Sequence, residues 1–375
     1  VLARTPDAPK GTKGISLFLV PKFEVSDDGV VGSRNGVSTN SIESKMGIKG
    51  SPTCVLNFEN SKGIMIGPEN KGLNSMFTMM NLERIVVGVQ GLGIAETAYQ
   101  NAVAYSKERK QGKANNSKNG ETDLIIKHAD IRRSLMNMKS IIEGQRSFAF
   151  WLSQQIDVSL SHDDKDVRGD ASNMVALLTP VIKSFFTDNG VEITNDAIQV
   201  FGGYGYTKDQ GIEQLFRDNR ITPIYEGTNS VQAIDLVYRK ISSEGIFENF
   251  IKSMDNEIKN YKNEKNLESF LNIFEKYREI LVSFTKWMRE KINSNKDDAS
   301  AACNDYLKVL GYTALAFAWI KTLKISFEKQ NSNKEFYEDK INTGKYYFEK
   351  ILPRAQSHYV VGTSGSHTTM NAKFN

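Results

Sequence analysis

The chain has 375 residues, which exceeds the size at which a single hydrophobic core usually stops growing, so we expect two or three domains. Its 48 basic and 44 acidic side chains give a net charge of +4, and the two signs are interleaved, which argues against a nucleic-acid-binding surface. Two cysteines, Cys54 and Cys303, favour a reducing compartment over a disulfide framework, and no apolar run is long enough to span a membrane.

Residues 1–70 have the pattern of short β-strands. Gly14–Val20 is an apolar run that ends at Pro21, and Thr53–Asn60 alternates with a period of two. A few short strands do not form a stable sheet alone. Because the chain starts at Val1 inside a strand-like pattern, we expect an N-terminally truncated fragment whose strands complete a barrel or sandwich begun upstream.

A helical pattern begins near Leu73 and continues as one long helix or two joined helices. Gly88, Gly91 and Gly93 lie inside it, although each glycine in a helix costs roughly 1 kcal/mol. We therefore predict that another backbone or a ligand approaches the helix closely at these positions.

Further helices are predicted over 126–157, over 170–199 despite Pro180, and from about residue 212. Residues 245–355 have the pattern of amphipathic helices rich in Lys, Asn and Glu. The expected fold is mainly α with a partial β domain. Its predicted parts are 1–70 (partial β), 71–243 (helical), 244–355 (appended helical domain) and 356–375 (flexible tail).

Two short motifs are compatible with binding of a cofactor. Gly202 and Gly203 in "QVFGGYGY" either end a helix or form a loop whose backbone amides reach polar groups of a ligand. Arg109 in "RKQGK" either complements the end of a helix or binds a phosphate through its planar fork of donors. The motifs alone leave both alternatives open.

Two charged residues, Arg84 and Glu226, are candidates for an active site or for an ordinary structural or solvent-exposed role. Arg84 interrupts the apolar helix "MMNLERIVVG", so it either pairs with an acid such as Glu83 or faces a ligand-lined cleft. Glu226 lies between Tyr225 and Gly227, and it can act as a base if it is buried beside a flat cofactor ring. An exposed Glu226 would have no such role.

Taken in chain order, these motifs resemble the acyl-CoA dehydrogenase family. The resemblance covers residues 1–241 and is most specific in "QVFGGYGY" and "RDNRITPIYEGTN". It implies the remnant of a middle β-barrel or sandwich domain followed by a C-terminal helical bundle. "ARTPDAPKGTKGISLFLVPK", "KHADIRRSLMNMKS" and the added helical block are similar to the subgroup of 3-methylmercaptopropionyl-CoA dehydrogenases.

The resemblance implies dehydrogenation of an acyl-CoA thioester to the 2-enoyl-CoA by bound FAD. Glu226 corresponds to the base that removes the α-proton while the β-hydrogen leaves as hydride to the flavin. Arg84 and Tyr225 correspond to substrate-binding residues. The residues that correspond to cofactor contacts, several of them across a subunit interface, are Arg109, Gln111, Gln199, Gly202, Gly203 and Thr228.

The same resemblance implies a cytoplasmic homodimer or homotetramer that passes electrons to an electron-transfer flavoprotein, with no metal, membrane or nucleic-acid partner. Two alternatives are an acyl-CoA oxidase, in which oxygen reoxidises the flavin, and a nucleic-acid-binding flavoprotein on the same scaffold. The second alternative requires a concentrated basic surface, whereas residues 245–355 mix Lys with Glu and Asp throughout.

Overall fold

The computed structural model describes residues 1–115, 122–242 and 244–374. The chain divides into two compact units, Val1–Glu83 and Arg84–Asn375, and the division falls within helix α1 (Gly72–Ser106). Within the described ranges, no helix combines the length and the apolar character needed to cross a bilayer. The predicted division into three domains and a tail stays a prediction, and its boundary residue 243 lies outside the described residues.

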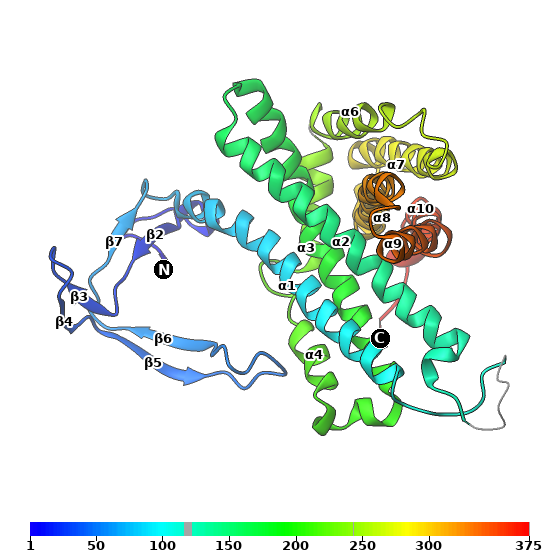
Figure 1. Cartoon of the computed structure of the whole chain (residues 1–375). Coiled ribbons are helices and arrows are strands. Elements are labelled where there is room, and N and C mark those ends of the chain that lie inside the picture. Colours follow the sequence, from blue (N-terminus) through cyan, green and yellow to red (C-terminus); the bar gives the residue numbers. More distant parts are fainter. Residues whose placement is uncertain (116–121, 243, 375) are drawn as a thin grey trace. The chain divides into compact units, whose positions relative to one another are not determined.

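The first unit consists of short antiparallel strands (Figure 1). They form the three sheets β1-β2-β7, β3-β4 and β5-β6. The strands are β1 (Leu2–Ala3), β2 (Ser16–Leu19), β3 (Phe23–Val25), β4 (Val31–Arg34), β5 (Val37–Ile42), β6 (Cys54–Phe58) and β7 (Ile64–Ile66).

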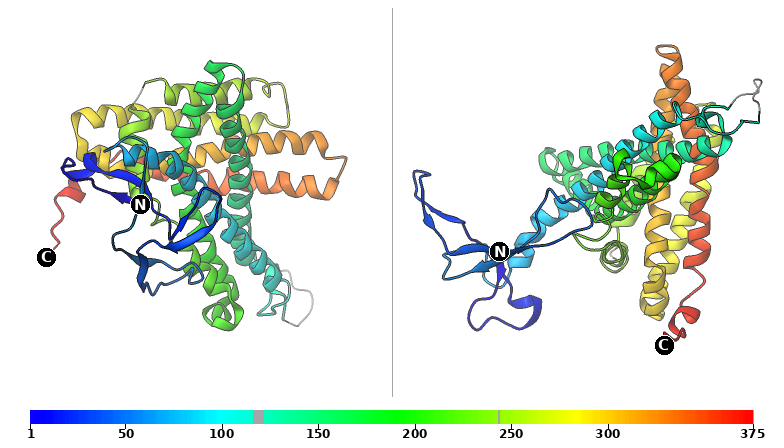
Figure 2. Two further views of the ribbon diagram at one scale, coloured as in Figure 1. Left: turned by 90° about the vertical axis from the view of Figure 1, so that its left-hand side faces the viewer. Right: turned by 90° about the horizontal axis from the view of Figure 1, so that it is seen from below.

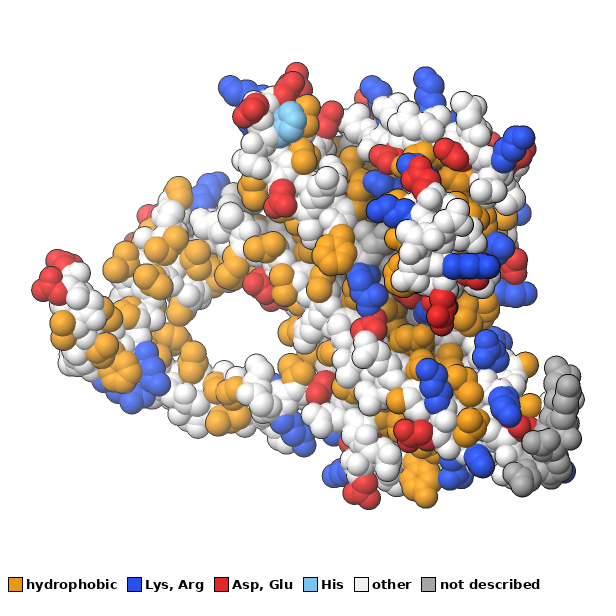
Figure 3. Space-filling view, in the orientation of Figure 1, with side chains coloured by type: hydrophobic (Ala, Val, Ile, Leu, Met, Phe, Trp, Pro, Cys, Tyr) orange, Lys and Arg blue, Asp and Glu red, His pale blue; other side chains and the backbone are white. Residues whose placement is uncertain are grey.

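Apolar strand residues in this unit stay on the surface. Leu19, Ile42 and Ile64 are 58%, 66% and 65% exposed. Figure 3 shows hydrophobic side chains spread over this unit. The strands therefore bury little apolar area among themselves, which confirms the prediction of a partial β domain.

The second unit is helical, which confirms that the fold is mainly α (Figure 1). After α1 come α2 (Ala129–Ser161), α3 (Lys165–Phe201), α4 (Ile212–Asn219), α5 (Asn229–Asp235), α6 (Ile246–Lys259), α7 (Glu268–Ser294), α8 (Lys296–Lys329), α9 (Lys334–Tyr346), α10 (Arg354–Gly362) and α11 (His367–Met370). Short 3₁₀ turns are η1 (Gly11–Gly14), η2 (Ile125–Lys127), η3 (Gly202–Tyr206) and η4 (Lys208–Gln210), and π turns are η5 (Leu236–Ile241) and η6 (Tyr347–Ile351).

Helix α3 is the scaffold of the site described below. It begins after Asp164, whose side chain accepts hydrogen bonds from the backbone N–H groups of Asp166 and Val167 and so caps the helix. It continues through Pro180, as the sequence predicted. It ends at Gly202, whose positive φ of 60° is a value that glycine adopts without strain.

Helices α1 and α3 approach each other at glycines. A Cβ atom on Gly88 would lie 2.7 Å from the carbonyl oxygen of Ile182, and one on Gly190 would lie 2.9 Å from the carbonyl oxygen of Gly91. The predicted close approach is therefore confirmed at Gly88 and Gly91. It is wrong for Gly93, where an added Cβ would meet no atom within 4 Å because that side of the helix faces away from the contact.

The residues after 244 share their core with α2 and α3. One cluster of buried apolar residues runs from Ile85 to Ala355. At its centre Trp319 of α8 is buried, and its indole N–H donates to the carbonyl oxygen of Ser140 in α2 at 3.0 Å. Figure 2 shows α8 and α9 (orange) as a pair of neighbouring helices, and their residues contact each other.

Residues 356–374 include the end of α10 and the short helix α11. Ser366 is buried there, and its N–H and hydroxyl donate to the Asp298 carboxylate at 2.8 and 2.7 Å. The expected flexible tail thus contains secondary structure that the small, polar composition did not indicate. Its flexibility stays a prediction.

Candidate active site

The segment 222–228, named here the Glu226 turn, connects α4 to α5. Glu226 has a φ of 58° and Gly227 a φ of 84°, so two successive residues are left-handed. This conformation costs a non-glycine residue roughly 1–2 kcal/mol. Glu226 keeps this left-handed conformation because side chains of α1, α3 and α5 bind the backbone of the turn.

Three side chains donate hydrogen bonds to two carbonyl oxygens of the turn. Arg84 Nε (α1) lies 3.3 Å from the carbonyl oxygen of Glu226. Gln232 Nε2 (α5) lies 3.0 Å from the same oxygen and 3.3 Å from that of Gly227. Lys183 Nζ (α3) lies 2.8 Å from the carbonyl oxygen of Gly227. The two carbonyls are therefore fixed toward the helices.

Lys183 is fully buried, and its ammonium also donates to Asn229 Oδ1 at 2.9 Å. Asn229 in turn donates to Asp188 Oδ1 at 2.7 Å. Burial lowers the pKa of Lys183 to about 8, and the charge of Arg84 acts in the same direction, whereas Asp188 and Glu226 act against it. The turn is thus attached to a cation that is shielded from water.

The carboxylate of Glu226 has free hydrogen-bonding capacity. Its Oε2 atom is buried and has no hydrogen-bond partner in the described part of the chain. Across residues 1–115, 122–242 and 244–374, the backbone N–H of Glu226 has no acceptor either. A buried polar atom without a partner is costly, so the turn presents an acceptor and a donor that a ligand can satisfy.

The neighbouring residues of the turn have defined positions. Tyr225 is half-buried, and its hydroxyl donates to Gln90 Oε1 on α1. Thr228 is the N-cap of α5, where its hydroxyl accepts from the N–H of Val231 at 3.4 Å. The structure therefore places Glu226, Arg84, Tyr225 and Thr228 close together, and their roles stay predictions.

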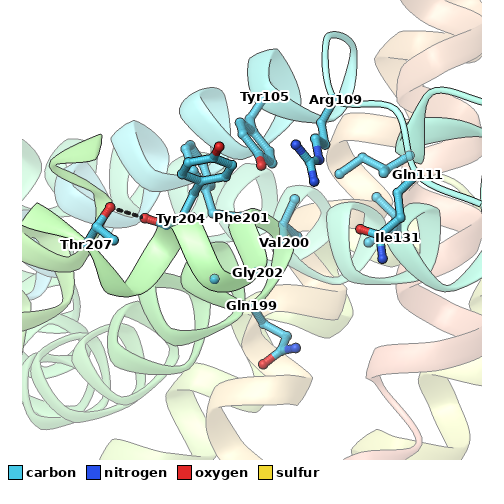
Figure 4. Close-up of a pocket in the computed structure, with 12 residues that line it drawn as sticks. Tyr105, Arg109, Gln111, Ile131, Gln199, Val200, Phe201, Gly202, Tyr204 and Thr207 are labelled. Carbon is cyan, nitrogen blue, oxygen red and sulfur yellow. Dashed lines mark hydrogen bonds between the residues drawn. The ribbon is translucent and has the colours of Figure 1, made fainter. Parts of the chain in front are cut away.

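The other predicted residues meet in a cavity of about 550 Å³ near the ends of α1 and α3 (Figure 4). The guanidinium of Arg109 lies over the ring of Tyr204, 5.6 Å from its centroid. Cβ atoms on Gly202 and Gly203 would meet no atom within 4 Å, so the backbone there is open. The residues that line the cavity are Tyr105, Arg109, Gln111, Ile125, Ile131, Gln199, Val200, Phe201, Gly202, Gly203, Tyr204 and Thr207.

This cavity, named here the Arg109 cavity, is distant from the Glu226 turn. Lys183 and Gln199 lie on the same helix, and at 1.5 Å per residue their separation along it is about 24 Å. No residue of the Glu226 turn lines the cavity. The nine predicted site residues therefore form two clusters on one protomer.

Comparisons with known proteins give the family. Residues 70–241 match the family model "Acyl-CoA dehydrogenase, C-terminal domain", and residues 250–373 match the model "Acetyl-CoA dehydrogenase C-terminal like". The chain belongs to the acyl-CoA dehydrogenase family. Family members are flavin-dependent oxidoreductases that use FAD.

The chain is similar to two curated acyl-CoA dehydrogenases. It is 42% identical over 245 residues to the 3-methylmercaptopropionyl-CoA dehydrogenase of Ruegeria pomeroyi, covering 65% of this chain and 42% of that protein. It is 32% identical over 368 residues to a butyryl-CoA dehydrogenase of Syntrophomonas wolfei, covering 94% of this chain and 60% of that protein. The chain thus spans between two fifths and three fifths of these relatives' length.

A solved structure has the same fold. The acyl-CoA dehydrogenase of Bacillus anthracis, determined in complex with FAD, matches 99% of this chain and 62% of its own with a TM-score of 0.74 at 19% identity. Its likeness extends over the helices after residue 244. The added helical block is therefore part of a fold that another acyl-CoA dehydrogenase has.

Apart from Arg84, the residues that hold the Glu226 turn in place were not predicted from the sequence. Lys183, Asn229 and Gln232 contact the turn, and Tyr204 covers Arg109 in the other cluster. A signal for Lys183 was present, since it is the lone charge in the apolar helical stretch "ALLTPVIKSFF". No comparable signal marked Asn229 or Gln232, whose roles depend on how α5 packs.

Proposed function

We propose that the protein catalyses FAD-dependent α,β-dehydrogenation of an acyl-CoA thioester, with Glu226 as the base that removes the α-proton. The observation that carries this proposal is the buried, unpartnered Oε2 atom of Glu226 beside a backbone N–H that has no acceptor in the described part of the chain. A substrate with an acidic C–H next to a carbonyl oxygen satisfies both groups at once.

The two groups of Glu226 have complementary tasks. The carboxylate accepts the α-proton, a positioned base of this kind contributing roughly 10²–10⁴-fold to the rate. The N–H of the same residue donates to the thioester carbonyl oxygen, on which negative charge develops as the proton leaves. Bound FAD supplies the acceptor for the hydride from the β-carbon. Arg84 and Tyr225 border the base and are proposed to contact the acyl group.

The residues of the Arg109 cavity fit FAD. Arg109 forms no ion pair with a carboxylate in the described ranges, so its guanidinium can bind a diphosphate bidentately. Gln111 and Gln199 offer amide groups at the cavity wall, and the open backbone at Gly202 and Gly203 admits a close approach. Thr228 lies beside the base, and we propose that it contacts a second FAD molecule, the one that the Glu226 turn faces.

The distance of about 24 Å along α3 between the two clusters supports two cofactors in a dimer or tetramer. In this arrangement the Glu226 turn faces the FAD of its own subunit. The Arg109 cavity then contacts the FAD of a neighbouring copy. This proposal agrees with the implied contacts across a subunit interface.

The proposed substrates are short acyl-CoA thioesters. The names of the two similar enzymes specify 3-methylmercaptopropionyl-CoA and butyryl-CoA, both with short acyl chains. The proposed electron acceptor is an electron-transfer flavoprotein, and the proposed location is the cytoplasm.

The test is anaerobic bleaching of the bound flavin in the full-length holoenzyme by a panel of acyl-CoA thioesters of increasing length. Glu226→Gln keeps the shape of the side chain but removes the base, so we expect flavin reduction to slow by roughly 10²–10⁴-fold. The matched control is Glu290→Gln, which changes an exposed glutamate of α7 and should reduce flavin like the wild type. Wild-type bleaching in the Glu226→Gln variant would remove Glu226 from the reaction.

A further inference from the structure

We infer that Lys183 is a positioning residue for the Glu226 base, acting as the buried cation that fixes the Glu226 turn to helix α3. The inference rests on the proposed function, because positioning has meaning only if Glu226 is the base. Lys183 is proposed to touch neither substrate nor cofactor, and it acts through the backbone of the turn.

The backbone from which Lys183 projects is fixed. Its neighbour Ile182 lies at the close crossing of α1 and α3, where a Cβ on Gly88 would lie 2.7 Å from the Ile182 carbonyl oxygen. The two helix backbones are closely packed at this crossing. A side chain that leaves α3 there therefore has a well-defined origin, as a positioning residue requires.

Lys183 and its neighbours on α3 hold the C-terminal end of the turn and the first residue of α5. The ammonium donates to the Gly227 carbonyl oxygen at 2.8 Å and to Asn229 Oδ1 at 2.9 Å. Asn229 Nδ2 donates onward to Thr187 Oγ1 at 3.0 Å and to Asp188 Oδ1 at 2.7 Å. Lys183 and Thr187 are four residues apart and therefore share one face of α3, so two contacts directly after the base in the chain, at Gly227 and Asn229, are made with the same helix.

These contacts also determine the direction in which the base points. Because the carbonyls of Glu226 and Gly227 are bonded on the helix side, the left-handed φ values of 58° and 84° are maintained. Loss of the Lys183 contact would leave the Gly227 carbonyl oxygen with Gln232 at 3.3 Å as its donor. The turn could then relax toward an ordinary conformation and carry the Glu226 carboxylate away from its position.

The positive charge of Lys183 adds an electrostatic contact to the geometric one. Burial and the charge of Arg84 disfavour the ammonium, whereas Asp188 and the Glu226 carboxylate attract it. A neutral amide in the same place could donate hydrogen bonds but would not attract the carboxylate. Charge-assisted hydrogen bonds are the stronger kind, so a cation holds the turn more firmly than an amide would.

The experiment compares variants of the full-length holoenzyme at matched FAD content. Lys183→Met should slow anaerobic flavin reduction roughly tenfold to hundredfold, with little change in the affinity for acyl-CoA. Lys183→Arg, which keeps the charge, should recover part of the rate. Lys165→Met removes an exposed lysine from the start of the same helix and should behave as wild type.

A second readout does not depend on turnover. Hydrogen–deuterium exchange of a peptide that covers residues 222–232 should be faster in Lys183→Met than in the wild type, with unchanged exchange in α8. If Lys183→Met does not fold, Asn229→Ser, which opens the other contact with α3, carries the same test and should give the same loss of protection.

The outcomes separate the two proposals. Wild-type flavin reduction by Glu226→Gln would overturn the proposed function itself. A slow Glu226→Gln variant beside a Lys183→Met variant with wild-type rate and exchange would overturn the role of Lys183 and leave the base in place. In a third outcome, the rate of Lys183→Met falls only in proportion to lost FAD or lost folded protein, and hydrogen exchange in 222–232 is unchanged. Lys183 would then be a structural residue, and the inference would also be overturned.

Discussion

Replacement of Trp319 by alanine tests whether residues 84–374 unfold as one cooperative body. Trp319 is buried in α8, donates to Ser140 in α2 and packs so closely on Gly144 that a Cβ there would lie 2.7 Å from its Nε1. Removing a buried tryptophan costs about 3–5 kcal/mol. For a body of this size that loss lowers the melting temperature by roughly 6–10 °C.

The assay is thermal unfolding followed by circular dichroism, combined with hydrogen exchange of peptides from α2 and α8. We expect a single transition that shifts as a whole, with protection lost in both helices, because the apolar core is continuous between them. Phe336→Ala removes a half-exposed ring from α9 and should leave the melting temperature within a degree or two. A separate early transition confined to α7–α10, with α2 unchanged, would refute the reasoning.

Three further predictions concern the two clusters. Arg109→Ala should weaken FAD binding about tenfold to hundredfold in a fluorescence titration, since one charged hydrogen-bonding group is lost; unchanged affinity would contradict the assignment of the Arg109 cavity. Gly227→Ala should slow flavin reduction, because Gly227 has a φ of 84° and an added Cβ would lie 2.8 Å from Gln232 Nε2; a wild-type rate would show that the turn tolerates the methyl group. Burial lowers the pKa of Lys183 to about 8, whereas the unfolded chain keeps this lysine protonated up to about pH 10.5, so between these values the unfolded state binds more protons than the folded state. The free energy of unfolding of the wild type should therefore rise relative to that of Lys183→Met as the pH increases through this window, by on the order of 3 kcal/mol at most. A stability difference between the two proteins that does not change with pH would refute this prediction.

The helices and their glycine contacts could be predicted because their signals are local. The period of apolar residues placed α1, α2 and α3, and the cost of glycine in a helix indicated the close crossing at Gly88 and Gly91. Gly93 gave the same local signal but faces away from α3. Periodicity gives the existence of a contact and not the side on which each glycine lies.

The alternatives that the motifs left open depended on tertiary contacts. Gly202 both ends α3 and lines the Arg109 cavity. The two interpretations of "FGG", the end of a helix and a loop open to a ligand, are therefore compatible. Arg84 had been expected to meet an acid or a cleft, and one of its contacts is the carbonyl oxygen of Glu226, 142 residues away. Such a partner depends on the packing of α1 against the turn, which no local pattern encodes.

The left-handed conformation of Glu226 also has a consequence for selection. Glycine at position 226 would adopt the observed φ of 58° without strain and would leave no buried carboxylate oxygen unpartnered. We therefore expect Glu226→Gly to melt above the wild type while being inactive. Under the proposed function, a screen of variants by thermal stability alone would therefore enrich an inactive variant at this position.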